Sequence, residues 1–256
     1  MSDGGGHQRR RRGIYLLPNL FTTAALFAGF YAIIAAVGGR FTEAAAAIFV
    51  AMVLDGVDGR VARLTNTQSA FGTEYDSLAD MVSFGVAPAL VTFLWLLHDT
   101  GNLGWLAAFV YTAGAALRLA RFNAQVATAD KRYFQGLPSP AAAALIAGLV
   151  WLGASYEEPG LGWTPLAIVL LIAAGLLMVS NFRYHSFKQL DMRGRVPFMT
   201  LLVVVLLFVL IALDPPQILF AGFLLYAMSG PVLTLLHLRR HRQERRGSDD
   251  GAPPSS

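Results

Sequence analysis

The 256-residue sequence contains no cysteine, which excludes disulfide bonds, thiolate nucleophiles and cysteine metal sites. Charge is also scarce, because Asp, Glu, Lys and Arg make up 14% of the residues, whereas soluble domains carry about 25%. Hydrophobic residues make up 55% of the chain. They fall in long runs, several of which are long enough to cross a hydrocarbon layer about 30 Å thick. The sequence therefore predicts an integral membrane protein.

The apolar runs divide the chain into helical segments. A secretory signal would share the basic start of the chain, but its apolar region would be shorter, so the first run is interpreted as an uncleaved span. The expected fold class is all-α, a polytopic integral membrane protein with about eight transmembrane helices. The expected spans are about 15–38, 43–62, 74–97, 104–122, 139–156, 164–180, 197–213 and 216–237.

Three regions follow from this division. Residues 1–12 form a basic tail and residues 239–256 a polar tail, and both are expected to be disordered. Residues 13–238 form the membrane domain. The sequence of this domain contains no internal repeat, which disfavours an inverted-repeat transporter.

The basic residues set the expected orientation in the membrane. If the N-terminus is cytoplasmic and the chain crosses eight times, 19 of the 20 Lys and Arg residues lie on the cytoplasmic side, and only Arg40 lies outside. Acidic residues such as Asp99 and Asp214 fall in the opposite loops. Both termini are therefore expected in the cytoplasm. This orientation explains the net charge of +4, so no nucleic-acid partner is expected.

One stretch concentrates the acidic side chains. Asp55 and Asp58 are three residues apart and Asp76 and Asp80 are four apart, so each pair shares a helix face. A short link joins the two predicted helices, which as antiparallel neighbours bring the four carboxylates together. Carboxylates at membrane depth are costly and indicate function by default. Oxygen-only ligands favour Mg²⁺, Mn²⁺ or Ca²⁺, and two ions roughly 3.5–4 Å apart suit phosphoryl chemistry.

Two glycines, Gly56 and Gly59, alternate with the first two acids. Glycine costs a helix about 1 kcal/mol relative to alanine, so its repeated use suggests that a bulky group approaches the backbone closely. Arg63 lies one turn beyond Gly59, from where its guanidinium can reach a phosphate. Two alternatives stay open: the glycines serve only helix packing, or the acids form a cation-transport site.

Together these residues resemble the signature of the CDP-alcohol phosphatidyltransferase family. Every fixed position of that signature is matched, and the resemblance extends over roughly residues 14–200. The matching residues are Asp55, Gly56, Asp58, Gly59, Ala62, Arg63, Gly72, Asp76 and Asp80.

Flanking segments resemble the phosphatidylserine synthase branch of that family. The similarity implies a reaction in which CDP-diacylglycerol and L-serine give phosphatidylserine and CMP. Another acceptor alcohol, such as glycerol 3-phosphate or an inositol phosphate, stays open within the family, and a cation-binding transporter stays open outside it. The flanking segments are residues 18–22, 76–80, 83–88, 117–123 and 136–140.

The resemblance also implies roles for individual residues. It implies two bound Mg²⁺ or Mn²⁺ ions and makes Asp80 the proton acceptor for the serine hydroxyl as well as a metal ligand. It suggests a homodimer, and the absence of a targeting segment beyond the spans fits a plasma membrane, with the active site on the cytoplasmic side. The implied metal ligands are Asp55, Asp58, Asp76 and Asp80. The implied nucleotide contacts are Pro18, Asn19, Gly59, Arg63 and Ser69.

An amino-acid acceptor must be held by its carboxylate and its ammonium group. Arg118, Arg121 and Asn123 lie at the cytoplasmic end of the predicted span 104–122, and arginine offers a carboxylate two parallel hydrogen-bond donors. We hypothesise that these three residues help form the serine pocket. The alternative is that the two arginines bind anionic lipid head groups.

Overall fold

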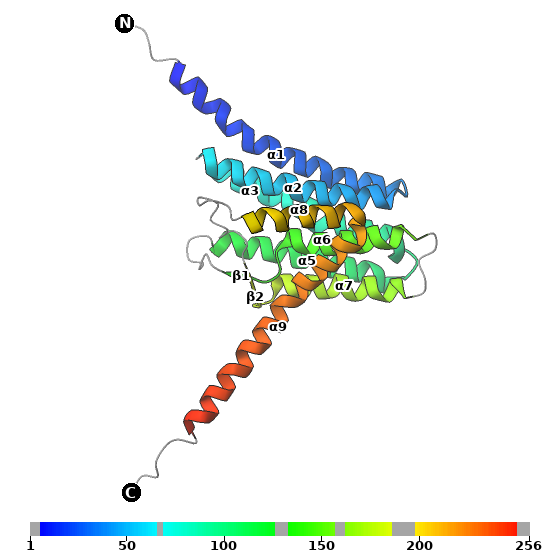
Figure 1. Cartoon of the computed structure of the whole chain (residues 1–256). Coiled ribbons are helices and arrows are strands. Elements are labelled where there is room, and N and C mark those ends of the chain that lie inside the picture. Colours follow the sequence, from blue (N-terminus) through cyan, green and yellow to red (C-terminus); the bar gives the residue numbers. More distant parts are fainter. Residues whose placement is uncertain (1–5, 66–68, 126–132, 157–161, 186–197, 250–256) are drawn as a thin grey trace.

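The computed structural model describes residues 6–65, 69–125, 133–156, 162–185 and 198–249. Most helices lie side by side in an elongated bundle, and the last helix crosses it diagonally and extends beyond it (Figure 1). The elements in chain order are α1 (Gly6–Val37), α2 (Phe41–Thr65), α3 (Ala70–Asp80), η1 (Met81–Val86), α4 (Ala87–Thr92), η2 (Phe93–Leu97), α5 (Asn102–Gln125), β1 (Tyr133–Gln135), α6 (Ser139–Ala154), α7 (Trp163–Val179), β2 (Arg183–His185), α8 (Phe198–Leu213) and α9 (Pro215–Asp249).

The all-α fold class predicted from the sequence is confirmed. Each predicted apolar segment coincides with a helix or with a continuous helical run, because apolar stretches of this length bury their backbone polar groups most readily as helices. The helix bounds differ from the predicted ones at the two ends of the chain. Helix α1 begins at Gly6 and helix α9 continues to Asp249, so each of these helices extends into a predicted tail. A short antiparallel hairpin of β1 and β2 was also not predicted.

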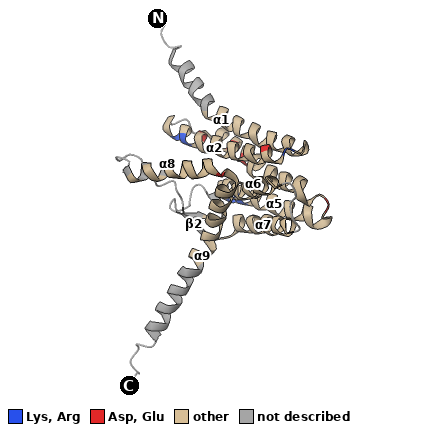
Figure 2. Cartoon of the chain, turned by 45° about the vertical axis from the view of Figure 1, so that its right-hand side comes forward, with Lys and Arg blue, Asp and Glu red and all other residues tan. Residues whose placement is uncertain are grey.

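Long apolar helices support the membrane assignment. Outside the segments drawn in grey, few residues of the helices are Lys, Arg, Asp or Glu (Figure 2). Two shorter apolar helices, Ser139–Ala154 and Trp163–Val179, accompany the long ones. The total of eight spans and the cytoplasmic location of the termini stay predictions. Among the described residues, the helices long and apolar enough to cross a membrane are Pro18–Val37, Ala70–Leu97, Asn102–Ala124 and Pro215–Thr234.

The first two helices form the most extensive pair of the bundle. Their tight turn contains Gly39 with φ +73°, a left-handed backbone conformation that favours glycine. Fully buried alanines such as Ala32 and Ala44 lie in the core of this region and let the helices approach closely. Helix α1 therefore lies along α2 and reaches the acidic segment at the far end of α2.

Residues 70–97 form one continuous helical run that contains two π-helical stretches, η1 and η2. The first π-helical stretch, η1, begins at Met81, directly after Asp80. Extra residues in a π-turn free backbone carbonyls and are frequent at functional sites. Here the buried Tyr111 of α5 donates its hydroxyl hydrogen to the carbonyl of Phe84 at 2.9 Å. Helix α5 is thereby held against the segment that follows the last acid.

The hairpin is anchored to α9 by one aromatic side chain. Tyr184 of β2 is buried, and its hydroxyl donates to the carbonyl of Ala227 at 2.9 Å. Burial raises the pKa of Tyr184 to about 12, so the hydroxyl keeps its proton and remains a donor at neutral pH. A Cβ at Gly230 would lie 2.3 Å from the Tyr184 ring, so only glycine admits the ring there.

Candidate metal centre and substrate site

Three carboxylates meet where α2 and α3 come together. One carboxylate oxygen from each of Asp55, Asp76 and Asp80 lies within 4.8 Å of the other two. Asp76 and Asp80 are one turn apart on α3, so the helix places both on the face that Asp55 approaches from α2. The predicted convergence of the two acidic segments is therefore present for these three residues.

The donor set of this cluster fits a divalent cation. The Asp80 carboxylate is close enough to those of Asp55 and Asp76 to interact electrostatically with both. All three side chains are partly buried, so water screens their mutual repulsion poorly. A cation between the oxygens relieves that repulsion, and oxygen-only ligands suit Mg²⁺ or Mn²⁺.

The fourth acid, Asp58, has a different environment. Among the described residues it is not a member of the cluster whose oxygens meet within 4.8 Å. Its side chain is 5% exposed, and the hydroxyl of Thr22 on α1 donates to its Oδ2 at 2.8 Å. The Asp58 side chain of α2 thus contacts helix α1 through Thr22.

Open space flanks the two glycines of the acidic segment. A Cβ at Gly56 or Gly59 would meet no heavy atom within 4 Å among the described residues. Helix packing therefore does not account for these two glycines in the described chain, and their smooth surface is available to a ligand. Arg63, one turn further along α2, is exposed.

Residues from two helices gather at the start of α3. The Ser69 hydroxyl caps α3 by accepting the Gly72 backbone N–H at 3.0 Å. A Cβ at Gly72 would lie 3.2 Å from this Ser69 Oγ and 3.4 Å from Oδ1 of Asn19. The predicted nucleotide contacts Asn19 and Ser69 therefore lie together, next to buried Pro18 of α1.

Arg118 points into the partly buried region near the acids. One of its terminal nitrogens donates to the hydroxyl of buried Ser139 on α6 at 2.7 Å. Its Nε is buried and has no hydrogen-bond partner in the part of the chain that the structure describes. Asp80 and Asp55 are close enough to interact electrostatically with its guanidinium. Arg118 thus has one buried donor still available beside the acidic cluster.

The other two residues of the hypothetical serine pocket have contacts of their own. Arg121 donates to Oε1 of Gln135 at 2.6 Å and to Oδ1 of Asn181 at 2.7 Å, which links α5 to the hairpin region. Asn123 donates to the hydroxyl of Ser77 on α3 at 3.0 Å. Both residues hold neighbouring segments in place around Arg118.

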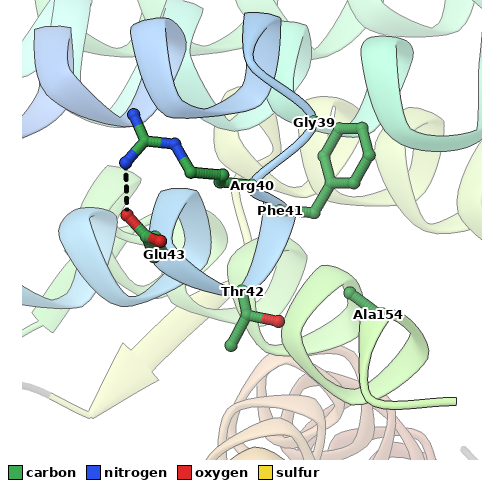
Figure 3. Close-up of a pocket in the computed structure, with 6 residues that line it drawn as sticks. All are labelled: Gly39, Arg40, Phe41, Thr42, Glu43 and Ala154. Carbon is green, nitrogen blue, oxygen red and sulfur yellow. Dashed lines mark hydrogen bonds and ion pairs between the residues drawn. The ribbon is translucent and has the colours of Figure 1, made fainter.

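A separate pocket lies at the turn between α1 and α2. Figure 3 shows its lining, in which Arg40 and Glu43 form an ion pair of 2.8 Å. The hydroxyl of Tyr31 donates to the same Glu43 carboxylate. This pocket is at the opposite end of α2 from Asp55, and its two charges satisfy each other. It is therefore not part of the acidic centre.

The helical fold and the acidic centre define a membrane protein with a candidate divalent-cation site. A family model described as CDP-alcohol phosphatidyltransferase matches residues 15–164, which run from within α1 to the start of α7 and include all four acids. The chain belongs to the CDP-alcohol phosphatidyltransferase family, and it is a transferase of phospholipid biosynthesis.

Relatives from three domains of life carry one name, CDP-diacylglycerol–serine O-phosphatidyltransferase. The chain is 41% identical over 196 residues to the protein of Helicobacter pylori strain J99, covering 77% of this chain and 83% of the relative. It is 39% identical over 144 residues to that of Methanocaldococcus jannaschii, covering 56% and 63% respectively. It is 43% identical over 141 residues to that of Saccharomyces cerevisiae, covering 49% and 50%.

Proposed function

We propose that the chain transfers the phosphatidyl group of CDP-diacylglycerol to the hydroxyl of L-serine and releases CMP. The observation that carries this proposal is the meeting of Asp55, Asp76 and Asp80, three acids of the family signature, at the junction of α2 and α3. The shared name of the relatives supports serine as the acceptor. Lipid tails can stay in the bilayer while the head group enters the site from one end of the bundle.

The four acids are the proposed ligands of two Mg²⁺ or Mn²⁺ ions. Asp55, Asp76 and Asp80 would hold an ion between them, and Asp58 would add a carboxylate from the same helix as Asp55. When bound, such ions neutralise the charge that develops on the diphosphate and on the departing CMP.

Asp80 is the proposed proton acceptor. Its carboxylate takes the proton of the serine hydroxyl, whose oxygen forms a new bond to the phosphorus that carries diacylglycerol. The bond from that phosphorus to the bridging oxygen of the diphosphate breaks, and CMP leaves with the bridging oxygen and its electron pair. Asp80 then returns its proton to solvent.

The nucleotide is proposed to bind over the open face of α2. In the part of the chain that the structure describes, no heavy atom would lie within 4 Å of a Cβ at Gly59, so a bulky group can come close to the backbone there. Arg63 can pair with a phosphate there. Asn19 of α1 and Ser69 at the start of α3 lie together beside Gly72 and supply polar contacts. Pro18 lies next to Asn19 on α1.

The serine carboxylate is proposed to bind Arg118. Its buried Nε has no hydrogen-bond partner among the described residues, and its guanidinium interacts electrostatically with Asp80; both support a position beside the reacting hydroxyl. Arg121 and Asn123 shape the same pocket through their contacts with the hairpin region and with α3. The alternative for the arginines, binding of lipid head groups, predicts no dependence of serine affinity on Arg118.

Replacement of Arg118 by lysine is expected to raise the KM for serine. Lysine keeps the charge but loses the planar fork, and a charge-assisted hydrogen bond contributes about 1.5–3 kcal/mol, which corresponds to about a 10- to 140-fold change. Steady-state kinetics of CMP release measure this, with the KM for CDP-diacylglycerol as the internal control. If Arg121→Lys raised the KM for serine more than Arg118→Lys did, Arg121 and not Arg118 would be the residue that binds the serine carboxylate.

A panel of acceptor alcohols tests the proposed reaction. Purified protein with CDP-diacylglycerol and Mn²⁺ or Mg²⁺ is expected to release CMP when L-serine is added, and to stop when the metal is chelated. The same assay contains glycerol 3-phosphate and inositol phosphate. If CMP were released with one of these alcohols and not with serine, that alcohol and not serine would be the acceptor. Cation flux in vesicles without CMP release would favour the transporter alternative.

The orientation of the site follows from the charge pattern of the sequence. In the predicted topology, 19 of the 20 Lys and Arg residues lie on the cytoplasmic side of the membrane, as does the link between the two acidic helices. We therefore propose that the acidic centre faces the cytoplasm at the plasma membrane. The homodimer implied by the family resemblance stays a prediction.

A further inference from the structure

One buried hydroxyl on α1 contacts an acid of the signature directly. Thr22 is 4% exposed, and its Oγ1 lies 2.8 Å from Oδ2 of Asp58 and 3.2 Å from the carbonyl oxygen of Pro18. A hydroxyl carries a single proton, so it can donate fully to only one of these oxygens. The shorter distance and the charge of the carboxylate favour Asp58 as the acceptor.

The carboxylate of Asp58 keeps acceptor capacity beyond this bond. An ionised carboxylate offers about four lone-pair positions. Among the described residues, the Thr22 hydroxyl occupies one of these positions. The remaining positions are available to a cation, and Asp58 lies three residues from Asp55 on α2.

We propose that Thr22 is a positioning residue, which fixes the Asp58 carboxylate in the orientation from which it completes the cation site of Asp55, Asp76 and Asp80. The inference rests on the proposed metal site. Partners that orient a metal ligand typically contribute 10- to 100-fold to metal affinity. Helix α1 also carries Asn19, which lies close to the start of α3. The same helix therefore contributes both a proposed nucleotide contact and the residue that orients Asp58.

Thr92 provides a matched control within the same chain. It is 0% exposed, and its hydroxyl donates to the carbonyl of Pro88 at 2.8 Å, four residues earlier in its helix. Thr22 has the equivalent carbonyl, that of Pro18, at 3.2 Å, but its hydroxyl also lies 2.8 Å from Asp58, the favoured acceptor of its proton. Thr92→Val therefore removes a buried helical threonine hydroxyl without touching the acids.

The test measures Mn²⁺ binding in the absence of any substrate. Purified full-length variants are titrated with Mn²⁺ alone, and the signal of free Mn²⁺ is followed by electron paramagnetic resonance. Thr22→Val is expected to weaken Mn²⁺ binding by about 10-fold or more. Thr22→Ser is expected to restore it, and Thr92→Val to bind Mn²⁺ as the unmodified chain does. The thermal unfolding midpoint of each variant in detergent separates loss of the ion site from loss of the fold.

A double variant decides whether Thr22 acts through Asp58. In the Asp58→Asn background, Thr22→Val is expected to cause no further loss of Mn²⁺ affinity, because the oriented ligand is already gone. Unchanged Mn²⁺ binding in Thr22→Val, or losses that add in the double variant, would overturn the inference. Because the readout needs no acceptor alcohol, the inference stands or falls independently of whether serine is the acceptor.

Discussion

Asp80→Asn is expected to reduce CMP release from CDP-diacylglycerol and serine by about 10²–10⁴-fold, the contribution of a well-placed general base. The amide has nearly the shape of the carboxylate but cannot take the proton of the serine hydroxyl. It also removes one of the three negative charges that meet within 4.8 Å. Both changes act on the reaction, while the packing of η1 directly after Asp80 is left in place.

The measurement is the rate of CMP release at saturating serine and metal, with the folded fraction checked by size-exclusion chromatography in detergent. Asp99→Asn is the matched control, because Asp99 is an exposed aspartate whose partner is His98, away from the cluster. Asp76→Asn is expected to lose activity as well, through the metal site. Full activity in Asp76→Asn or Asp80→Asn would refute the proposed centre.

The sequence predicted the helices and the meeting of the acids for local reasons. Apolar runs of membrane-crossing length form helices because no other structure satisfies their backbone in lipid. Spacings of three and four residues then place acids on a common helix face, which requires no knowledge of tertiary contacts. The pair Asp76 and Asp80 is the clearest case, since both belong to the cluster that the structure forms.

Contacts between distant segments could not be predicted in the same way. The bond from Thr22 to Asp58 joins residues 36 positions apart, and that from Arg118 to Ser139 depends on how α5 meets α6. Thr22 and Ser139 both lie in segments that resemble the family, but no spacing rule indicates their partners. The π-helical stretch after Asp80 is equally hidden, because the carbonyl of Phe84 within it accepts a hydrogen bond from Tyr111 of another helix.

Gly114→Leu is expected to prevent normal folding. Gly114 of α5 faces Gly175 of α7, and a Cβ at Gly114 would lie 2.5 Å from the Gly175 carbonyl oxygen. A Cβ at Gly175 would in turn lie 2.8 Å from the carbonyl oxygen of Val110. The obstacles are backbone atoms on packed helices, so no side-chain rotation relieves them. Overpacking typically costs about 1–3 kcal/mol and here should exceed that range, because two helices must separate.

Separation of α5 from α7 would also move Arg118, which lies one turn beyond Gly114. Gly114→Leu should therefore give a low yield of monodisperse protein in detergent, and any folded fraction should bind serine poorly. Gly222→Leu is the control, because a Cβ at Gly222 in α9 meets no heavy atom within 4 Å among the described residues, and this variant should fold normally. If Gly114→Leu instead gave the yield and thermal midpoint of Gly222→Leu, the close crossing of α5 and α7 would be wrong. The placement of Arg118 beside the acids, which depends on that crossing, would then lose its support.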